Sequence, residues 1–159
     1  MNGRDLPSLG PRGEGWVVLQ SVLFVVIAGC GFVGVYWPSS AESYLAVLGI
    51  LLIVAGFAVV LVAAFTLGRA FTPLPRPRRG ELRQHGIYRA VRHPIYGGVL
   101  ALALGWSFLE APLALLPTAL LAVVFDLKSR REEAWLVERY PEYGAYRERT
   151  PRRFIPLVW

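Results

Sequence analysis

The sequence is short of cysteine and histidine, and that shortage excludes several kinds of site. Cys30 is the single cysteine among 159 residues and lies within an apolar run, so neither an intramolecular disulfide nor a cysteine metal cluster is available. The histidines, His85 and His93, are eight residues apart without a cysteine or a close acidic cluster, whereas metal-binding pairs on a helix recur at i and i+4. We therefore predict no metal site.

The amino-terminal segment also lacks the pattern of a secretory signal peptide. Residues 1–15 are polar and rich in glycine and proline. No basic segment there directly adjoins a short apolar core with a small-residue cleavage site. We expect these residues to form a flexible tail.

Charge is absent from two long stretches, residues 16–37 and residues 44–65, each of which is 22 residues long. A helix of about 20 apolar residues crosses the hydrocarbon core of a bilayer. Trp16 and Trp37 bracket the first stretch and suit the membrane interface. The two stretches therefore predict a transmembrane hairpin over residues 16–65.

Two shorter apolar runs follow, residues 95–109 and residues 113–125. Because a helix rises about 1.5 Å per residue, these runs reach only roughly 20 Å across a hydrocarbon core of about 30 Å. We interpret them as a second hairpin that flanking residues or a thinned membrane lengthen. Gly98, Ala101 and Gly105 in the first run fit either a packing surface or one wall of a cofactor slot.

The second hairpin is expected to continue beyond the membrane as one helix from Leu113 to Tyr140. The segment after residue 125 is rich in helix-forming residues and has no proline or glycine as far as Tyr140. Lys128, Glu132, Leu136 and Tyr140 recur at every fourth position. They are therefore predicted to share one face of this helix.

Residues 145–159 are expected to return as a basic, aromatic tail. Its last six residues, 154–159, are apolar enough to pack on the membrane surface.

Positive charge is confined to one side of this arrangement. All 17 Lys and Arg residues lie in the amino-terminal tail, in residues 66–92 or after Phe125, and none lies in the two opposite turns. The positive-inside rule therefore places both termini and the 66–92 connection in the cytoplasm. A net charge of +6 beside apolar segments favours a membrane surface as the partner, and not a nucleic acid. The predicted fold is all-α and integral to the cytoplasmic (inner) membrane, with about four transmembrane helices as two hairpins and a cytosolic C-terminal helical extension.

The stretch from Gly86 to Gly98 turns from a basic, aromatic segment into an apolar helix. Pro94 suits the first helical turn and His93 then lies at the cap, so the next amides have no partner within the helix. One interpretation is a small-ligand site at the bilayer surface, where the positive end of the helix dipole attracts negative charge. The other is a helix start whose Tyr and Arg side chains only anchor it at the interface.

Glu132 and Glu133 also allow two interpretations. They can belong to a solvated face of ion pairs, each of which contributes a few tenths of a kcal/mol. The hairpin, however, places their helix beside the helix that starts at His93. Two carboxylates beside a helix start can hold a ligand that carries both an amine and a carboxylate.

These blocks together resemble the isoprenylcysteine carboxyl methyltransferase family, and the related phospholipid methyltransferases share much of the pattern. The resemblance covers roughly residues 80 to 156. It rests on Gly86-x-Tyr88-x3-Arg92-His93-Pro94-x-Tyr96-x-Gly98, then Glu132-Glu133-x2-Leu136, then Tyr143-x2-Tyr146-x3-Thr150-Pro151 and Phe154-Ile-Pro156.

The resemblance implies an integral membrane enzyme that uses S-adenosylmethionine and takes a lipophilic substrate from the bilayer. Residues 66–159 would then be its catalytic half. The matching cofactor-binding candidates are Tyr88, His93, Pro94, Tyr96, Gly98, Glu132 and Glu133.

The candidates for the chemistry itself are Lys128, Glu132 and Arg92. In the eukaryotic prenylcysteine enzymes an arginine stands where this chain has Lys128, and a lysine offers a point charge in place of a bidentate fork. The acceptor is therefore either a lipid-linked carboxylate, which needs no base, or a phospholipid amine. An amine must lose a proton, which makes Glu132 or His93 a candidate base. The sequence leaves the acceptor and the oligomeric state open.

Two other functions fit part of the pattern. Sterol reductases resemble the Arg-His-Pro and Tyr-Pro blocks and use NADPH, but their helix carries an Arg-Asp pattern with a following Cys where this chain has Glu132 and Glu133. A non-enzymatic four-helix membrane protein would need polar substrate groups within its spans. The spans offer only Gln20, Ser21, Ser107 and Thr118.

Overall fold

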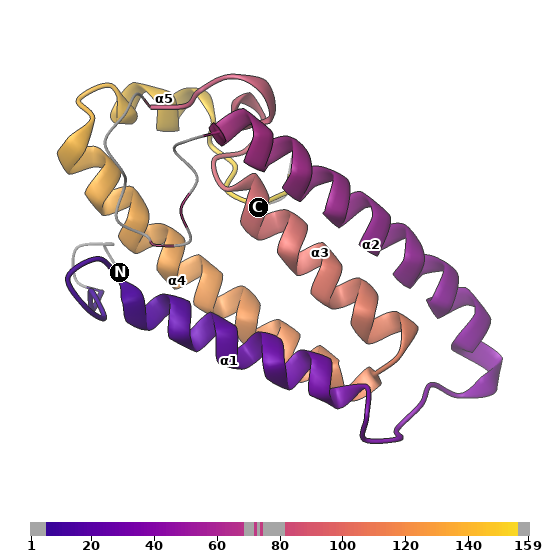
Figure 1. Cartoon of the computed structure of the whole chain (residues 1–159). Helices are drawn as coiled ribbons and strands as arrows, with labels where there is room; N and C mark the ends of the chain where they lie inside the picture. The colour runs from indigo at the N-terminus through magenta and orange to yellow at the C-terminus, as the bar shows by residue number, and fades with distance from the viewer. Residues whose placement is uncertain (1–5, 69–71, 73, 75–81, 156–159) are drawn as a thin grey trace.

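The computed structural model describes residues 6–68, 72, 74 and 82–155, and within these residues it is entirely helical (Figure 1). No strand occurs in that part of the chain, which confirms the predicted all-α class. The elements are α1 (Glu14–Cys30), α2 (Ser39–Leu67), η3 (Gly86–Arg89), α3 (Pro94–Leu109), η4 (Pro112–Ala114), α4 (Leu115–Arg139) and α5 (Tyr143–Arg149), where η marks a 3-10 helix.

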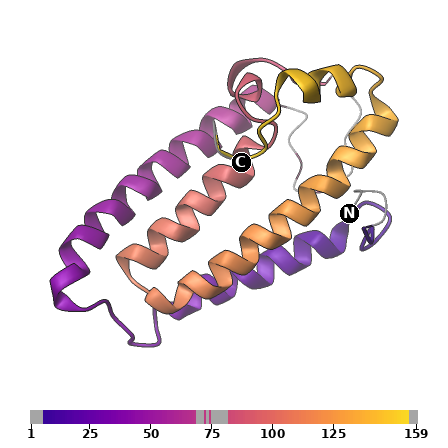
Figure 2. The same ribbon diagram turned by 180° about the vertical axis from the view of Figure 1, so that it is seen from behind.

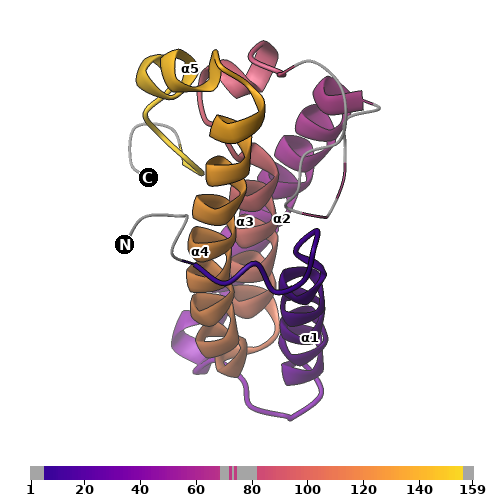
Figure 3. The same ribbon diagram turned by 90° about the vertical axis from the view of Figure 1, so that its left-hand side faces the viewer.

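The four long helices lie side by side as an elongated bundle in the spatial order α2, α3, α4, α1 (Figures 1 and 2). The turns that join α1 to α2 and α3 to α4 lie at one end of the bundle. The short helices η3 and α5 lie at the other end, as the view along the side of the bundle also shows (Figure 3). The end at which α3 begins and α4 finishes therefore carries the polar segments of the chain.

The first two helices follow one another in the chain but do not pack mainly on each other. Helix α1 packs on α4, and α2 packs on α3. The predicted hairpin over residues 16–65 thus has its two arms on opposite sides of the α3–α4 pair. A consequence is that residues of α1 reach the same interior as residues of α4.

Glycines explain why α2 selects α3. A Cβ atom at Gly56 would lie 2.6 Å from the carbonyl oxygen of Gly98, and one at Gly49 would lie 2.7 Å from that of Gly105. Real Cβ atoms do not come that close, so the backbones touch only because all four positions lack a side chain. Of the two roles that the sequence allowed for Gly98 and Gly105, the structure shows the packing role.

Two helices are long and apolar enough to cross a membrane, α2 with 29 residues and the stretch Pro112–Arg139 with 28 residues. Helices α1 and α3, with 17 and 16 residues, are apolar but shorter. The helix predicted over residues 16–37 ends at Cys30 because Gly31 caps it and Gly34 adopts a φ of +74°, which ordinary residues avoid. Large apolar side chains such as Val25 and Phe65 are exposed on the outer faces, as expected of a surface in contact with lipid.

The continuous helix predicted beyond residue 125 is present. Helix α4 runs unbroken to Arg139, and Tyr140 leaves the helix with an extended backbone just before Pro141. Two short helices were not predicted: η3 within the basic connection, and α5 in the segment expected to be a tail. Phe154, expected on the membrane surface, is instead buried in the main apolar core with residues of α1, α3 and α4. The rest of the predicted apolar tail, residues 156–159, lies outside the described residues.

Candidate functional site

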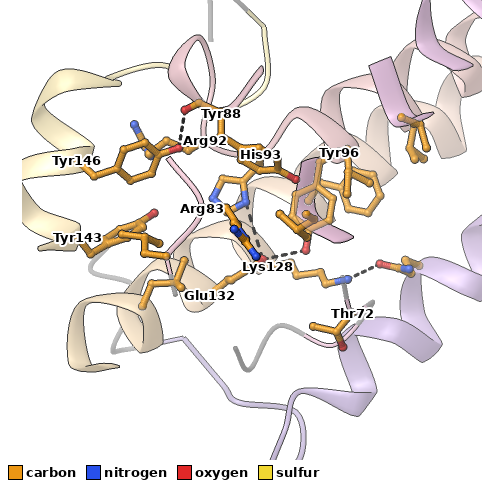
Figure 4. Close-up of a pocket in the computed structure, with 18 of the residues that line it drawn as sticks. Thr72, Arg83, Tyr88, Arg92, His93, Tyr96, Lys128, Glu132, Tyr143 and Tyr146 are labelled. Carbon is orange, nitrogen blue, oxygen red and sulfur yellow. Dashed lines mark hydrogen bonds and ion pairs between the residues drawn. The ribbon is translucent and has the colours of Figure 1, made fainter. Parts of the chain in front are cut away.

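A cavity of about 340 Å³ opens at the polar end of the bundle (Figure 4). Its walls come from α1, α2, α3, α4 and α5 and from the connection that precedes α3. Volumes of this order, roughly 300 to 1,000 Å³, are those of small-molecule sites. The polar side chains of the lining, tyrosines included, are those of Gln20, Thr72, Arg83, Tyr88, Arg92, His93, Tyr96, Lys128, Glu132, Tyr140, Tyr143 and Tyr146.

The start of α3 is held in place by the C-terminal segment of the chain. The backbone N–H groups of Arg92 and His93 donate to the carbonyl oxygens of Arg152 and Arg153, at 3.1 and 2.7 Å. Beyond them, the backbone of Phe154 lies so close to Gly97 that a Cβ atom there would collide with its carbonyl oxygen. Gly97 therefore makes room for the chain itself at the helix start.

Glu133 is committed to interactions inside the protein. Its Oε1 atom accepts a hydrogen bond from Arg92 Nε at 2.9 Å and lies 3.1 Å from His93 Nε2. Arg153 Nε approaches the same atom to 3.6 Å, and Arg92 also donates to the carbonyl oxygen of Thr150 at 2.6 Å. Both Glu133 and Arg92 are buried. This buried ion pair joins α4, the start of α3 and the C-terminal segment.

Glu132, the preceding residue, faces the cavity instead. Its Oε2 atom accepts a hydrogen bond from the hydroxyl of Tyr96 at 2.9 Å and lies 3.8 Å from His93 Nδ1. The imidazole of His93 therefore lies between the two neighbouring carboxylates, with one ring nitrogen toward each. His93 also stacks on Tyr96 with an interplanar angle of 2°, and Tyr96 stacks on Phe125, so a column of three aromatic rings fixes this wall.

Lys128 lies one helical turn before Glu132 and is almost fully buried, with 1% of its surface exposed. Its Nζ atom donates to Gln20 Oε1 of α1 at 2.5 Å and lies 5.1 Å from the centre of the Tyr96 ring. The predicted shared face is confirmed, since Lys128, Glu132, Leu136 and Tyr140 all line the cavity. Gln20 was visible in the sequence only as an isolated polar residue within an apolar run.

Three further tyrosines surround the cavity, Tyr88 on η3 and Tyr143 and Tyr146 on α5. Burial raises the pKa of Tyr146 to about 12 and raises the pKa values of Tyr88 and Tyr143 further still. All three hydroxyls are therefore protonated near neutral pH. The Tyr146 hydroxyl donates to the carbonyl oxygen of Tyr88 at 2.7 Å.

The structure thus brings together six of the predicted site residues on one cavity: Tyr88, Arg92, His93, Tyr96, Lys128 and Glu132. Pro94, Gly98 and Glu133 are buried nearby but are not part of its lining. Sequence reasoning did not single out Arg83, Tyr143 or Gln20 for the site. The tyrosine spacing 143 and 146 was a usable signal, whereas nothing distinguished Arg83 from its neighbouring arginines.

A comparison of the sequence with models of known protein families finds a match. The family model described as phospholipid methyltransferase matches residues 44–143, which is more than half of the chain and covers most of α2 and all of α3 and α4. No individual curated protein matches the chain. The match supports methyl transfer, and nothing found supports the reductase or the non-enzymatic alternative. The chain belongs to the phospholipid methyltransferase family.

Proposed function

We propose that this protein transfers a methyl group from S-adenosylmethionine to a lipophilic acceptor at the cytoplasmic face of the inner membrane. The observation that carries the proposal is a single cavity in which the carboxylate of Glu132, the Tyr96–His93 stack and Lys128 face apolar side chains such as Phe24 and Val60. A methyl donor is polar and a lipid is apolar. A site that accepts both needs walls of both kinds.

The residues present fit the proposed cofactor by the chemistry of their side chains. When bound, S-adenosylmethionine supplies an electrophilic methyl group on a sulfonium. The Glu132 carboxylate is suited to the ammonium group of the amino-acid portion, and the face of the Tyr88 ring attracts a sulfonium through cation–π contact. His93 and Tyr96 hold Glu132 in position through the contacts at 3.8 and 2.9 Å.

The task of the protein in such a displacement is to orient the two reactants and to exclude water. The buried stack of His93, Tyr96 and Phe125 supplies a fixed wall for orientation. A carboxylate acceptor is already ionised, and Lys128 would hold it as a point charge. An amine acceptor must first lose a proton, which Glu132 would accept, with His93 beside it and Glu133 beyond.

The acceptor is proposed to be a lipid-linked carboxylate, such as an isoprenylcysteine, or a phospholipid amine. The apolar wall contributed by α1, α2 and α3 would hold its hydrocarbon portion. The proposed orientation, with four spans and both termini in the cytoplasm, is supported by the placement of every Lys and Arg away from the two turns at the far end of the bundle. In this orientation the cavity opens where cytosolic cofactor and membrane lipid meet.

The test is binding of S-adenosylhomocysteine to purified protein in detergent, measured by calorimetry. Glu132→Ala and His93→Ala are expected to weaken binding about tenfold or more, because each removes a charged or hydrogen-bonding group from the cavity. Glu110→Ala, at an exposed position in the turn between α3 and α4, is the matched control and should bind normally. Unchanged affinity in both site variants, with folding intact, would count against the proposal.

The acceptor is identified by incubating the protein with methyl-labelled S-adenosylmethionine and native lipid extract. Label that is released by mild base indicates a methyl ester and therefore a carboxylate acceptor. Label that resists base indicates methylation of an amine. Protein with the Glu132→Ala substitution should leave both lipid fractions unlabelled.

A further inference from the structure

Arg83 is a cation of the cavity wall whose charge has no acidic partner within the part of the chain that the structure describes. Its Nε atom is buried there without a hydrogen-bond partner. Two neighbouring cations have hydrogen-bond partners: Arg92 pairs with Glu133, and Lys128 donates to the side-chain amide oxygen of Gln20. Figure 4 shows Arg83 in the middle of the labelled side chains, with Tyr143 on one side and Tyr96 on the other.

Tyr143 supplies a second buried polar group of the cavity wall, a hydroxyl without a hydrogen-bond partner among the described residues. Its side chain is 1% exposed and lines the cavity. The hydroxyl of Tyr146, on the same short helix, instead donates to the carbonyl oxygen of Tyr88. Burial raises the pKa of Tyr143, so its hydroxyl remains a donor at neutral pH. Buried polar groups in native proteins are rarely left unpaired.

We propose that Arg83 and Tyr143 together bind an oxyanion, a carboxylate or phosphate group, of a ligand held in the cavity. A guanidinium binds either group through two parallel hydrogen bonds, and a phenolic hydroxyl adds a third donor. The inference rests on the proposed function and extends it, because a methyl-transfer site offers two sources of such a group. One source is the carboxylate of the cofactor, and the other is the phosphate of a phospholipid acceptor.

The experiment compares each of two anionic ligands with a related compound that lacks the anionic group. Binding of S-adenosylhomocysteine is set against binding of 5′-methylthioadenosine, which lacks the amino-acid portion and its carboxylate. Binding of dioctanoyl phosphatidic acid is set against that of dioctanoylglycerol, which lacks the phosphate. Each is measured by calorimetry in a neutral detergent, with Arg83→Gln and Tyr143→Phe as the test variants.

Two control variants match the test variants in chemistry. Arg149→Gln removes a positive charge from an exposed side chain, whose guanidinium donates to Gln84 Oε1 at 2.8 Å. Tyr146→Phe removes a hydroxyl of α5 that is already bonded within the protein. Tyr143→Phe should leave the melting temperature unchanged or raise it, whereas Tyr146→Phe should lower it.

A loss of about tenfold or more in the affinity for S-adenosylhomocysteine alone, in both test variants, supports the proposal and assigns the group to the cofactor carboxylate. A similar loss for phosphatidic acid alone supports it and assigns the group to the acceptor. Unchanged affinity for both anionic ligands overturns it. Failure of the unaltered protein to bind S-adenosylhomocysteine would refute the proposed function, while the phosphatidic acid comparison would still decide for or against the oxyanion site.

Discussion

Two adjacent glutamates of α4 have different roles at the scale of the single residue. Glu133 is buried against Arg92 and His93, and Glu132 faces the cavity with Tyr96 as its hydrogen-bond donor. Successive residues of a helix point in directions about 100° apart. The pair therefore connects the interior of the protein to the site through one histidine.

This division predicts different consequences for the two isosteric substitutions. Glu133→Gln leaves Arg92 as an uncompensated buried charge, and we expect a loss of stability on the order of 3 kcal/mol. Glu132→Gln keeps the shape of a partly exposed side chain and should change stability by less than about 1 kcal/mol. It should nevertheless weaken binding of S-adenosylhomocysteine. Thermal unfolding and calorimetry on the same two preparations measure both effects.

The opposite result for the two variants would contradict this assignment of roles. A stable Glu133→Gln variant with weak cofactor binding would show that Glu133, and not Glu132, meets the cofactor. Arg139→Gln, on an exposed surface at the end of the same helix, serves as the control for loss of a charge from α4.

The sequence predicted part of the cavity wall because the spacing of those residues is local. Lys128, Glu132, Leu136 and Tyr140 are spaced four residues apart, so they lie on one face of a helix whatever the rest of the fold is. The position of Arg83 on the cavity wall could not be predicted from the sequence, because it is not set by local spacing. Its place on the wall depends on how the connection before α3 folds back, and the sequence of that connection has no periodicity.

At the scale of the helix, pairing in this protein is governed by glycine. The α2–α3 contact brings the backbone at Gly49 and Gly56 against Gly105 and Gly98. In a bilayer, where apolar side chains gain little by meeting one another, such close packing supplies much of the attraction between helices. Small residues in both runs were visible in the sequence, but which helix each would meet was not.

Addition of one methyl group at this contact should therefore destabilise the bundle. A Cβ atom at Gly56 would lie 2.6 Å from the Gly98 carbonyl oxygen, so Gly56→Ala forces the helices apart and should cost about 1 to 3 kcal/mol. Gly29→Ala is the matched control, because a Cβ atom at Gly29 in α1 meets nothing within 4 Å. It should be neutral or slightly stabilising, since alanine favours helix. Thermal unfolding in one detergent compares them, and equal melting temperatures would contradict the packing role.

At the scale of the whole molecule, the cavity is a product of the order in which the helices pack. The structure places α1 on α4, so Gln20 and Phe24 of α1 and Val60 of α2 line the same cavity as Glu132. We therefore propose that the first hairpin contributes to the site together with the expected catalytic half at residues 66–159. The pairing of α1 with α4 could not be predicted from the sequence, because an apolar helix with few polar residues does not indicate which neighbour it will choose.

Gln20 should therefore affect catalysis, although it lies in α1, outside the residues 44–143 that match the family. Its Oε1 atom accepts the hydrogen bond of Lys128 Nζ at 2.5 Å and so sets where the lysine charge lies. Gln20→Leu should lower kcat/KM for the acceptor about tenfold while leaving the affinity for S-adenosylhomocysteine unchanged.

Gln20→Glu keeps the shape of the side chain and an oxygen acceptor for Lys128, and it should retain most of the activity. Ser21→Ala provides the control at the next position, because the Ser21 hydroxyl donates within its own helix, to the Val17 carbonyl oxygen. If Gln20→Leu and Ser21→Ala behave alike, α1 contributes only apolar surface to the cavity. If they differ as expected, the first helix of this bundle positions a charged group of the site from across the bundle, and the active unit extends beyond residues 66–159.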